Sequence, residues 1–312
     1  MKPVTVLAIG GNSLVRSKDA ISYLDQMAAL TETCRHIADL AAAGIRLLIT
    51  HGNGPQVGFL LIRSHLARNR LPETPLDACT AQTQAETGYM IQQALGNELA
   101  RRNVSIPVVT IVTRTVVAAD DPAFKHPSKP VGPFYTKAEA ARLQKDLGWV
   151  MCEDSGRGFR RLVPSPRPVA IVELAQIAAL LESGAVVIAG GGGGIPVLQQ
   201  DGIYSGVAAV VDKDLASSLL AAELGATRLV ISTAVDRVYL DFGLPGQRPL
   251  TSIRAGELRS HLDAGQFAPG SMGPKIEAAL DFLERGGQEV IITDPDHLSL
   301  ALAGQAGTRI VP

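Results

Sequence analysis

The stretch that decides the fold of this chain is Val186-Val187-Ile188-Ala189-Gly190-Gly191-Gly192-Gly193-Gly194-Ile195-Pro196. An apolar, β-branched run typical of a buried strand leads directly into five glycines. Glycine costs backbone entropy and buries no side chain, so this run predicts a backbone that must approach something closely. At a strand end the commonest such partner is a phosphate held by main-chain N–H groups. A flexible linker is the alternative, but linkers mix serine with glycine and do not continue an apolar strand.

The composition favours an α/β protein. Of 312 residues, 46% are hydrophobic and only 4% aromatic, which suits helices packed on a parallel sheet. The formal net charge is −1, so no large basic field is present to hold nucleic acid or an anionic membrane. We therefore expect small-molecule partners, with any anion bound by local lysines and backbone dipoles.

Cysteine and histidine patterns predict no metal site. The three cysteines, Cys34, Cys79 and Cys152, have no ligand spacing, and the odd number without a framework favours a reducing compartment. His51 is isolated in a glycine turn. The apolar run near the N-terminus is too short for a signal peptide, and no charge-free run has transmembrane length. We expect a cytoplasmic protein.

Strand and helix patterns alternate along the whole chain. We expect strands at 5–9, 45–50, 108–117, 185–189, 228–232, 289–293 and 308–311. Helices are expected at 27–41, 77–102, 172–183, 215–224, 275–285 and 297–303, and a hairpin at 196–205 turns at Asp201-Gly202. Such alternation predicts right-handed βαβ units and a mainly parallel sheet.

Three glycine-rich turns follow expected strands: Gly10-Gly11, the stretch 51–58 and the five-glycine run. In a parallel sheet the carboxyl ends of these strands lie along one edge, where open α/β sheets bind their ligands. Asn12 and Asn53 lie beside these glycines. They either tolerate a left-handed backbone or donate amide hydrogens to a small oxyanion, and the sequence leaves both readings open.

The segment 118–168 interrupts the alternation with crowded prolines and a rise in charge. It is too long for an ordinary loop, so we expect an inserted subdomain, or lid, that projects from the sheet. The alternative is a surface excursion without function.

Three lysines stand where they could act on a phosphoryl group. Lys213 lies between Asp212 and Asp214 at an expected helix start, and an adjacent carboxylate can hold it and keep it charged. Lys275 also opens a helix, where a cation opposes the helix dipole, and Lys129 belongs to the lid. Fixed lysines supply the positioning and charge neutralisation that phosphoryl transfer needs. A solvated, charged helix start remains the alternative for Lys213.

Seven segments in order resemble the amino acid kinase family, and within it the branch that uses carbamate as acceptor. They lie at 9–12, 51–58, 128–135, 160–166, 190–194, 211–217 and 270–275. The resemblance implies a three-layer αβα sandwich with a mainly parallel open sheet and a small inserted protruding subdomain at 118–168. It implies a single domain over 1–312, with an acceptor-binding half at about 1–195 and an ATP-binding half at about 196–312.

The activity implied is reversible, Mg²⁺-dependent phosphoryl transfer between ATP with carbamate and ADP with carbamoyl phosphate. The family usually forms ATP in this reaction, at the end of arginine or allantoin breakdown, and acts as a homodimer. Carried over by position, Lys129, Lys213, Lys275 and Asp214 would be catalytic. The acceptor would be bound by Gly10, Gly11, Asn12, Gly52, Asn53 and Gly54. The nucleotide would be bound by Gly191, Gly192, Gly193, Asp212, Asp236, Tyr239, Met272 and Gly273.

Some positions depart from the family pattern, mainly near the acceptor. Ala85-Glu86 replaces an expected glycine, Ser13 stands where alanine is usual, Arg237 follows Asp236, and Ala208 replaces an acidic residue. A carboxylate at Glu86 would repel carbamate unless it pointed away from the site. These departures leave open a related kinase for another small carboxylate or carbamoyl acid. A catalytically silent nucleotide sensor is a further alternative, which retention of all three lysines opposes.

Overall fold

The structure is a computed structural model that describes residues 3–11, 14, 21–154 and 156–312. Its centre is an eight-stranded sheet in the order β15-β17-β16-β12-β1-β2-β9-β3. The strands are β15 (Ser252–Arg254), β17 (Thr308–Val311), β16 (Glu289–Thr293), β12 (Arg228–Ser232), β1 (Val4–Ile9), β2 (Arg46–His51), β9 (Val186–Ile188) and β3 (Val108–Thr110). From β16 to β3 all neighbours pair in parallel, whereas β17 is antiparallel to β16. The mainly parallel sheet is confirmed.

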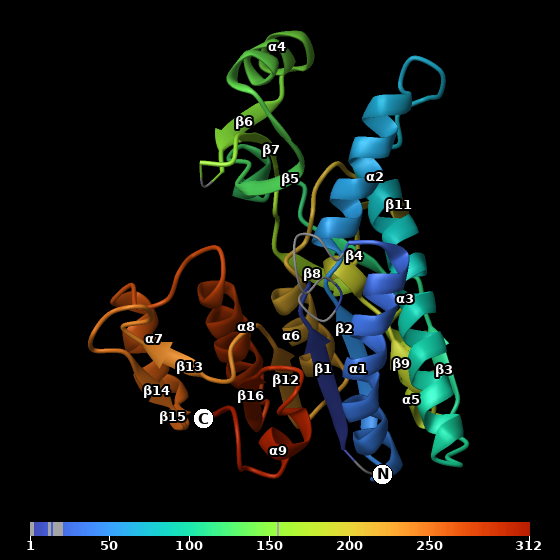
Figure 1. The fold of residues 1–312 in the computed structure, drawn as a ribbon, viewed down its shortest axis with the longest axis vertical. Coiled ribbons are helices and arrows are strands. Elements are labelled where there is room, and N and C mark those ends of the chain that lie inside the picture. Colours follow the sequence, from blue (N-terminus) through green and yellow to red (C-terminus); the bar gives the residue numbers. More distant parts are fainter. Residues whose placement is uncertain (1–2, 12–13, 15–20, 155) are drawn as a thin grey trace.

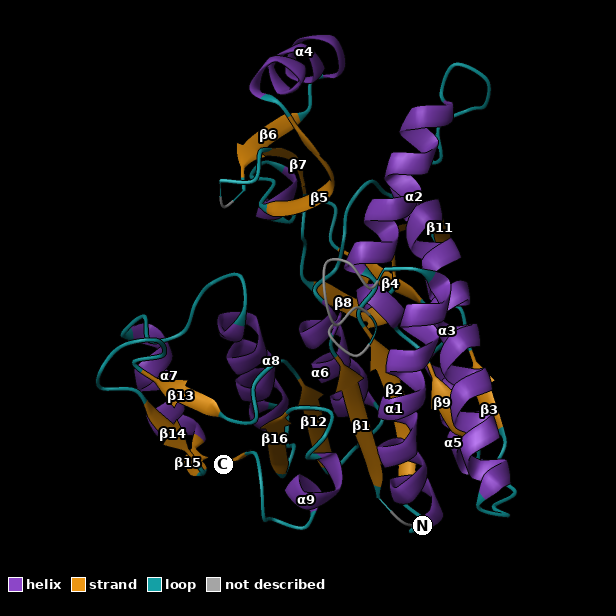
Figure 2. Ribbon diagram, in the orientation of Figure 1, coloured by secondary structure: helices purple, strands orange, loops and turns teal. Residues whose placement is uncertain are grey.

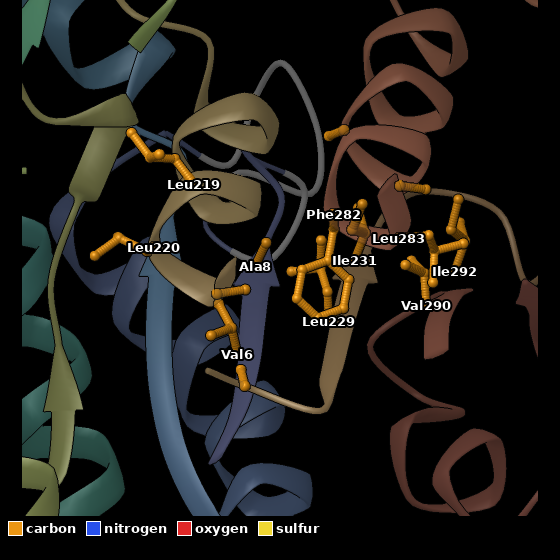
Figure 3. Close-up of a cluster of buried hydrophobic side chains, with 14 of the residues drawn as sticks. Val6, Ala8, Leu219, Leu220, Leu229, Ile231, Phe282, Leu283, Val290 and Ile292 are labelled. Carbon is orange, nitrogen blue, oxygen red and sulfur yellow. The ribbon is translucent and has the colours of Figure 1, made fainter. Parts of the chain in front are cut away.

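Helices cover both faces of this sheet, as Figures 1 and 2 show. One face packs against α1 (Tyr23–Ala42), α3 (Leu76–Arg101) and α9 (Leu298–Leu302). The other packs against α5 (Leu174–Glu182), α6 (Lys213–Glu223) and α8 (Met272–Glu284). Strand residues alternate between the two faces: Val6 and Ala8 of β1 lie in one core, Leu7 and Ile9 in the other. Figure 3 shows the first of these cores, where Phe282 of α8 packs near Leu229 and Ile231 of β12. The three-layer αβα sandwich is confirmed.

The prediction of a single strand at 108–117 is wrong. The segment is divided into β3, in the main sheet, and β4 (Arg114–Val117), in a four-stranded sheet ordered β11-β10-β4-β8. The other members are β10 (Ile195–Gln200), β11 (Ile203–Gly206) and β8 (Pro168–Ile171). Between the two strands, the N–H and C=O of Thr113 are both bonded to the side-chain amide of Gln84, and the C=O also accepts the N–H of Ile195 at the start of β10. The predicted hairpin is β10–β11, with Asp201 at φ 51° and Gly202 at φ 79° in its turn.

The lid projects away from the sheet (Figure 1). It contains β5 (Lys129–Tyr135), α4 (Lys137–Leu147), β6 (Val150–Glu153) and β7 (Phe159–Val163), with the strands ordered β5-β7-β6. Both ends of this unit lie together, because the N–H of Ser128 donates to the carbonyl oxygen of Val163 at 3.2 Å. Its base packs against α2 (Gly54–Ala67) through Val57 and Val131, with Leu61 alongside.

Residues 238–263, for which the sequence pattern predicted no helix or strand, form a small unit at the β15 end of the main sheet. It holds a short antiparallel hairpin, β13 (Val238–Leu240) with β14 (Arg248–Leu250), followed by β15 and α7 (Ala255–Asp263). These strands are three residues long each, too short to give a readable alternation in the sequence. None of the helices formed by the described residues combines the length and apolar character needed to span a lipid bilayer.

Candidate active site

The three glycine turns meet at the carboxyl edge of adjacent strands. β1, β2 and β9 are neighbours in the sheet. The turn after β1 lies against Gly52, and the turns after β2 and β9 contribute Gly52, Gly54 and Gly192 to the lining of a cavity of about 740 Å³. Its wall comes from the loop after β2, from the start of α6, from the segment before α8 and from the lid. Among the described residues, five cations, Lys129, Arg157, Arg160, Lys213 and Lys275, line it against two carboxylates, Asp212 and Asp214. This excess of positive charge makes the cavity suited to an anion.

The five-glycine run forms its tight turn against protein as well as against the cavity. Gly192 has φ 65° and lines the cavity, but a Cβ there would lie 2.2 Å from the amide oxygen of Asn53. Gly193 has φ 89°, and a Cβ there would lie 2.3 Å from the carbonyl oxygen of Val211. The close approach predicted from the sequence is therefore present, and the protein itself is the partner at both positions.

The buried side chain of Gln84 is hydrogen-bonded to the glycine run and to the segment beside it. The amide nitrogen of Gln84 donates to the carbonyl oxygens of Thr113 and Gly191, both at 3.0 Å, and its oxygen accepts from the Thr113 N–H at 2.8 Å. The hydroxyl of Thr113 accepts from the N–H of Gly190 at 2.9 Å. One side chain of α3 thus bonds the backbone of two loops, in which both accepting carbonyls also accept a main-chain N–H. Gln84 was not identified as a site residue from the sequence.

His51 and Asn53 fix the turn after β2. The Nδ1 of His51 donates to the carbonyl oxygen of Gly52 at 3.1 Å, and its Nε2 faces Gly191. Burial lowers the pKa of His51 to about 4, and the charge of Lys213 acts in the same direction, so the ring is neutral at physiological pH. The amide nitrogen of Asn53 donates to Thr83 at 2.8 Å, which holds this buried side chain at the cavity.

Asp214 holds two lysines at once. One carboxylate oxygen lies 2.5 Å from the Nζ of Lys213 and the other 2.9 Å from the Nζ of Lys275. Burial alone would raise the pKa of Asp214, but the two ammonium groups outweigh it and lower the pKa to about 2. The sequence predicted the pair with Lys213; it gave no sign of the second, because Lys275 lies 61 residues further along the chain.

This cluster lies where α6 and α8 begin. Asp212 caps α6, and the hydroxyl of Ser217 donates to the carbonyl oxygen of Lys213 at 2.7 Å. Ser217 also contacts the hydroxyl of Thr50 at 2.6 Å, which ties the first turn of α6 to the end of β2. Lys213 is therefore carried by a helix start anchored to the central sheet, and Lys275, at the start of α8, is held to the same helix through Asp214.

The lid contributes three cations of its own. The Nζ of Lys129 lies 2.9 Å from Asp212, across the cavity mouth. Arg157 and Arg160 both pair with Asp154, at 3.0 and 3.1 Å, and both lie over the ring of Phe134. The sequence identified this segment as charge-rich but did not single out the two arginines as cavity residues.

The predicted site residues divide into two groups. The cavity brings together Lys129, Lys213, Lys275, Asp214, Gly52, Asn53, Gly54, Gly192 and Asp212. The residues that do not line it are Gly10, Gly11, Gly191, Gly193, Met272, Gly273, Asp236 and Tyr239. Asn12 and Ser13 lie outside the described residues.

The residues outside the cavity have their own contacts. Gly10 lies against Ser232, where a Cβ would come 2.9 Å from the carbonyl oxygen. Asp236 accepts a hydrogen bond from the hydroxyl of Tyr239 at 2.8 Å, beside β13. Glu86, the departure that threatened the acceptor, is exposed on α3 and does not line the cavity. Its carboxylate therefore gives no reason to exclude carbamate.

The described carboxylates are not arranged as a metal cage. In the part of the chain that the structure describes, no group of three His, Cys, Asp or Glu side chains could hold a metal ion. The two carboxylates at the cavity already pair with lysines. Mg²⁺ commonly binds through substrate phosphates with few protein ligands, so this site fits a magnesium ion that arrives with a nucleotide.

Comparison with known proteins covers the full chain. A model described as the amino acid kinase family matches residues 3–294. The carbamate kinase of Pyrococcus furiosus is 46% identical over 309 residues, 98% of both chains. The carbamate kinase-like protein YahI of Escherichia coli is 47% identical over 315 residues, 100% of this chain and 99% of that protein. A carbamate kinase from Giardia lamblia bound to AMP-PNP matches with a TM-score of 0.94 at 40% identity, over 99% of this chain and 98% of that chain. This chain belongs to the amino acid kinase family.

Proposed function

We propose that this chain is a carbamate kinase, which transfers a phosphoryl group reversibly between ATP with carbamate and ADP with carbamoyl phosphate. The observation that carries the proposal is the convergence of Lys129, Lys213 and Lys275 on one cavity at the carboxyl edge of the sheet. The full-length likeness to carbamate kinases supports carbamate as the acceptor. The sequence resemblance favours the direction that forms ATP, at the end of arginine or allantoin breakdown.

The reaction asks the protein for positioning and charge balance. Toward ATP, a β-phosphate oxygen of ADP attacks the phosphorus of carbamoyl phosphate, and carbamate leaves with the electrons of the broken P–O bond. Because the reacting oxygens are already anionic, no side chain has to act as nucleophile or remove a proton. The transferred group spreads negative charge over three oxygens, which lysine ammonium groups stabilise. Lys213 and Lys275 would act from the sheet edge and Lys129 from the lid, while Asp214 keeps the first two in place.

The acceptor is proposed to lie on the β1 and β2 side of the cavity. Gly52, Asn53 and Gly54 line it there, and Gly10, Gly11 and Asn12 follow the neighbouring strand. The amide of Asn53, fixed by Thr83, is suited to donate to a carboxylate or carbamate oxygen. Neutral His51 behind this turn adds no charge that would compete for the acceptor.

The nucleotide is proposed to lie on the β12 and β16 side. Its phosphates would reach from there toward the glycine run after β9, at Gly191, Gly192 and Gly193. Asp236, Tyr239, Met272 and Gly273 would contact the rest of the nucleotide. The AMP-PNP complex of the Giardia lamblia enzyme supports this class of ligand. Mg²⁺ would come with the phosphates and would neutralise charge on the group in transfer.

The division into two halves follows the sheet order. β1, β2, β9 and β3 form one side of the sheet, and β12, β16, β17 and β15 form the other. This order supports an acceptor half at about 1–195 and an ATP half at about 196–312. We keep the lid at about 118–168, since its three-stranded sheet and α4 fall within these bounds.

We also propose a homodimer. β3 lies at an edge of the main sheet, and beside it Tyr89 and Val112 are about half exposed, at 56% and 47%. An exposed strand edge next to apolar side chains is a natural surface for a second copy. Sedimentation of the purified chain tests this: a species of twice the chain mass supports it, and a monomer at micromolar concentration contradicts it.

The direct test is ATP formation from ADP and carbamoyl phosphate in the presence of Mg²⁺, followed with luciferase. The Lys213→Ala variant, purified identically, controls for a contaminating kinase. Turnover by the wild type alone supports the proposal. Phosphorylation of another small carboxylate without turnover of carbamoyl phosphate would favour the related kinase, and firm ATP binding without any turnover would favour a sensor.

A further inference from the structure

Asp212 uses its two carboxylate oxygens for different tasks. Oδ1 accepts the N–H groups of Asp214 at 2.9 Å and Leu215 at 3.4 Å, which caps the start of α6. Oδ2 accepts from the Nζ of Lys129 at 2.9 Å. Lys129 begins β5 in the lid, 83 residues earlier in the chain. One side chain therefore joins the first turn of α6 to the lid.

This geometry differs from the role that the sequence resemblance implied for Asp212. Both of its oxygens already accept hydrogen bonds from protein donors, and a carboxylate repels the phosphates of a nucleotide. We propose that Asp212 is a positioning residue that anchors the lid lysine, Lys129, beside Lys213, and that it is not a ligand of the nucleotide. The inference rests on the proposed phosphoryl transfer, in which Lys129 acts on the transferred group.

The anchoring matters because Lys129 is the least buried of the three lysines. Its side chain is 43% exposed, against 13% for Lys213 and 15% for Lys275, which share buried Asp214. A free lysine side chain samples many rotamers, and holding one in place removes that freedom before the substrate arrives.

A second contact joins the lid to the segment that contains Asp212. The N–H of Val210 donates to the carbonyl oxygen of Pro164 at 3.0 Å, so the segment before α6 touches both the entry and the exit of the lid. The backbone contact and the Asp212–Lys129 pair together hold the lid against this segment, and Asp212 also orients the lysine. The pair itself is partly exposed and adds little to folding stability. Its effect is therefore expected on catalysis.

The test is the Asp212→Asn variant. Asparagine caps helices as well as aspartate does, but it has one acceptor oxygen and no charge to hold the ammonium of Lys129. We expect kcat/KM for carbamoyl phosphate to fall roughly tenfold or more, because Lys129 is no longer fixed. The Kd for ADP alone, measured by calorimetry, should stay within about twofold of the wild type, and the thermal midpoint within about 2 °C.

Asp121→Asn is the matched control. Asp121 also caps a helical turn, accepting the N–H of Ala123 at 2.8 Å, and its second oxygen accepts the backbone N–H of Arg167 at 3.0 Å. It lies outside the lining of the cavity. The same chemical change there should leave kcat/KM unchanged. If Asp212→Asn also leaves kcat/KM unchanged, the proposal is wrong, and if it weakens ADP binding in parallel, Asp212 is a nucleotide ligand.

A double-mutant cycle separates positioning from a general structural defect. If Asp212 acts through Lys129, then Asp212→Asn in a Lys129→Met background costs nothing further in kcat/KM. Losses that multiply would overturn the proposal, and this comparison holds even if Asp212→Asn is somewhat less stable.

A spectroscopic readout keeps the proposal testable if carbamoyl phosphate is not the substrate. Trp149 is the chain's one tryptophan and lies in the lid, with the Arg161 guanidinium 4.4 Å from its ring centre and α2 across a small cavity. Loss of the anchor should shift Trp149 emission in Asp212→Asn and leave it unchanged in Asp121→Asn. Absence of turnover by the wild type would refute the proposed reaction, whereas unchanged emission would refute the anchor.

Discussion

The cavity is lined by cations on two sides, and the two sides hold their charges differently. On the sheet side, Lys213 and Lys275 are 13% and 15% exposed and share one carboxylate that is 5% exposed. On the lid side, Lys129 and Arg157 are 43% and 47% exposed, while Arg160, at 20%, shares Asp154 with Arg157 over the ring of Phe134. Charges in the drier environment interact more strongly and are costly to leave unpaired. The charges on the sheet side are thus held in fixed positions, whereas those on the lid side can adjust their positions when an anion binds.

The largest effect should come from removing the shared carboxylate. Asp214→Ala leaves two nearly buried ammonium groups without a counter-ion, which should lower the free energy of unfolding by about 3–5 kcal/mol. Urea denaturation measures this. The control is Asp146→Ala, which breaks an exposed pair with Arg142 in the lid and should change stability by less than about 1 kcal/mol. Equal losses of unfolding free energy in the two variants would contradict the proposed difference between the sheet side and the lid side.

Catalysis should depend most on the sheet-side lysines. Lys213→Ala should reduce turnover of carbamoyl phosphate by about a hundredfold or more, since a fixed positive charge on the transferred group is lost, while the fold survives. Steady-state kinetics with circular dichroism as a folding check measures this. Lys145→Ala, a surface change in the lid helix α4, serves as control. Activity near that of the wild type in Lys213→Ala would remove the proposed role of this residue.

Acid should weaken the sheet side through His51. Its pKa falls from 6.5 in the unfolded chain to about 4 in the folded one, so the unfolded chain binds the extra proton between these values. The contribution of neutral His51 to the free energy of unfolding is complete above pH 6.5 and is lost as the pH falls toward 4. At pH 5 the loss is about 2 kcal/mol. Unfolding free energies at pH 7.5 and pH 5 should show this loss in the wild type and not in His51→Gln. The same pH slope in both proteins would contradict it.

The smallest effect is expected on the lid side. Arg160→Ala should raise the KM for carbamoyl phosphate by roughly tenfold, about 1.4 kcal/mol, with a smaller change in kcat, because a capturing charge is lost and the fixed cluster remains. Arg160→Lys keeps the charge and should recover part of the loss. A fall in kcat as large as that of Lys213→Ala would place Arg160 with the sheet-side cluster.

Periodicity in the sequence was enough to predict alternating strands and helices and a mainly parallel sheet, because β1, β2, β9, β12 and β16 are apolar runs buried on both faces. The three-layer sandwich itself was implied by the family resemblance. Periodicity failed at 108–117, where the apolar pattern continues while the chain changes sheets. At the break between β3 and β4, the backbone of Thr113 is bonded to the amide of Gln84 on a distant helix. Such a long-range hydrogen bond leaves no mark in local hydrophobicity.

The site was predicted unevenly for the same reason. Lys213 and Asp214 are adjacent, so their pairing could be read directly from the chain. The bonds from Lys275 to Asp214 and from Lys129 to Asp212 span 61 and 83 residues and follow from the packed fold alone. Arg157 and Arg160 were visible as charge, but their direction toward the cavity depends on Phe134 and Asp154.

The paired neck of the lid has a consequence for how such enzymes diversify. Because Ser128 and Val163 are hydrogen-bonded neighbours, the chain enters and leaves the lid at one point, and the central sheet is unaffected by what lies between them. Insertions between closely spaced ends are well tolerated in domains. The lid can therefore be exchanged as a module that leaves Lys213 and Lys275 of the sheet edge in place, provided that the new segment again supplies a lysine at the position of Lys129.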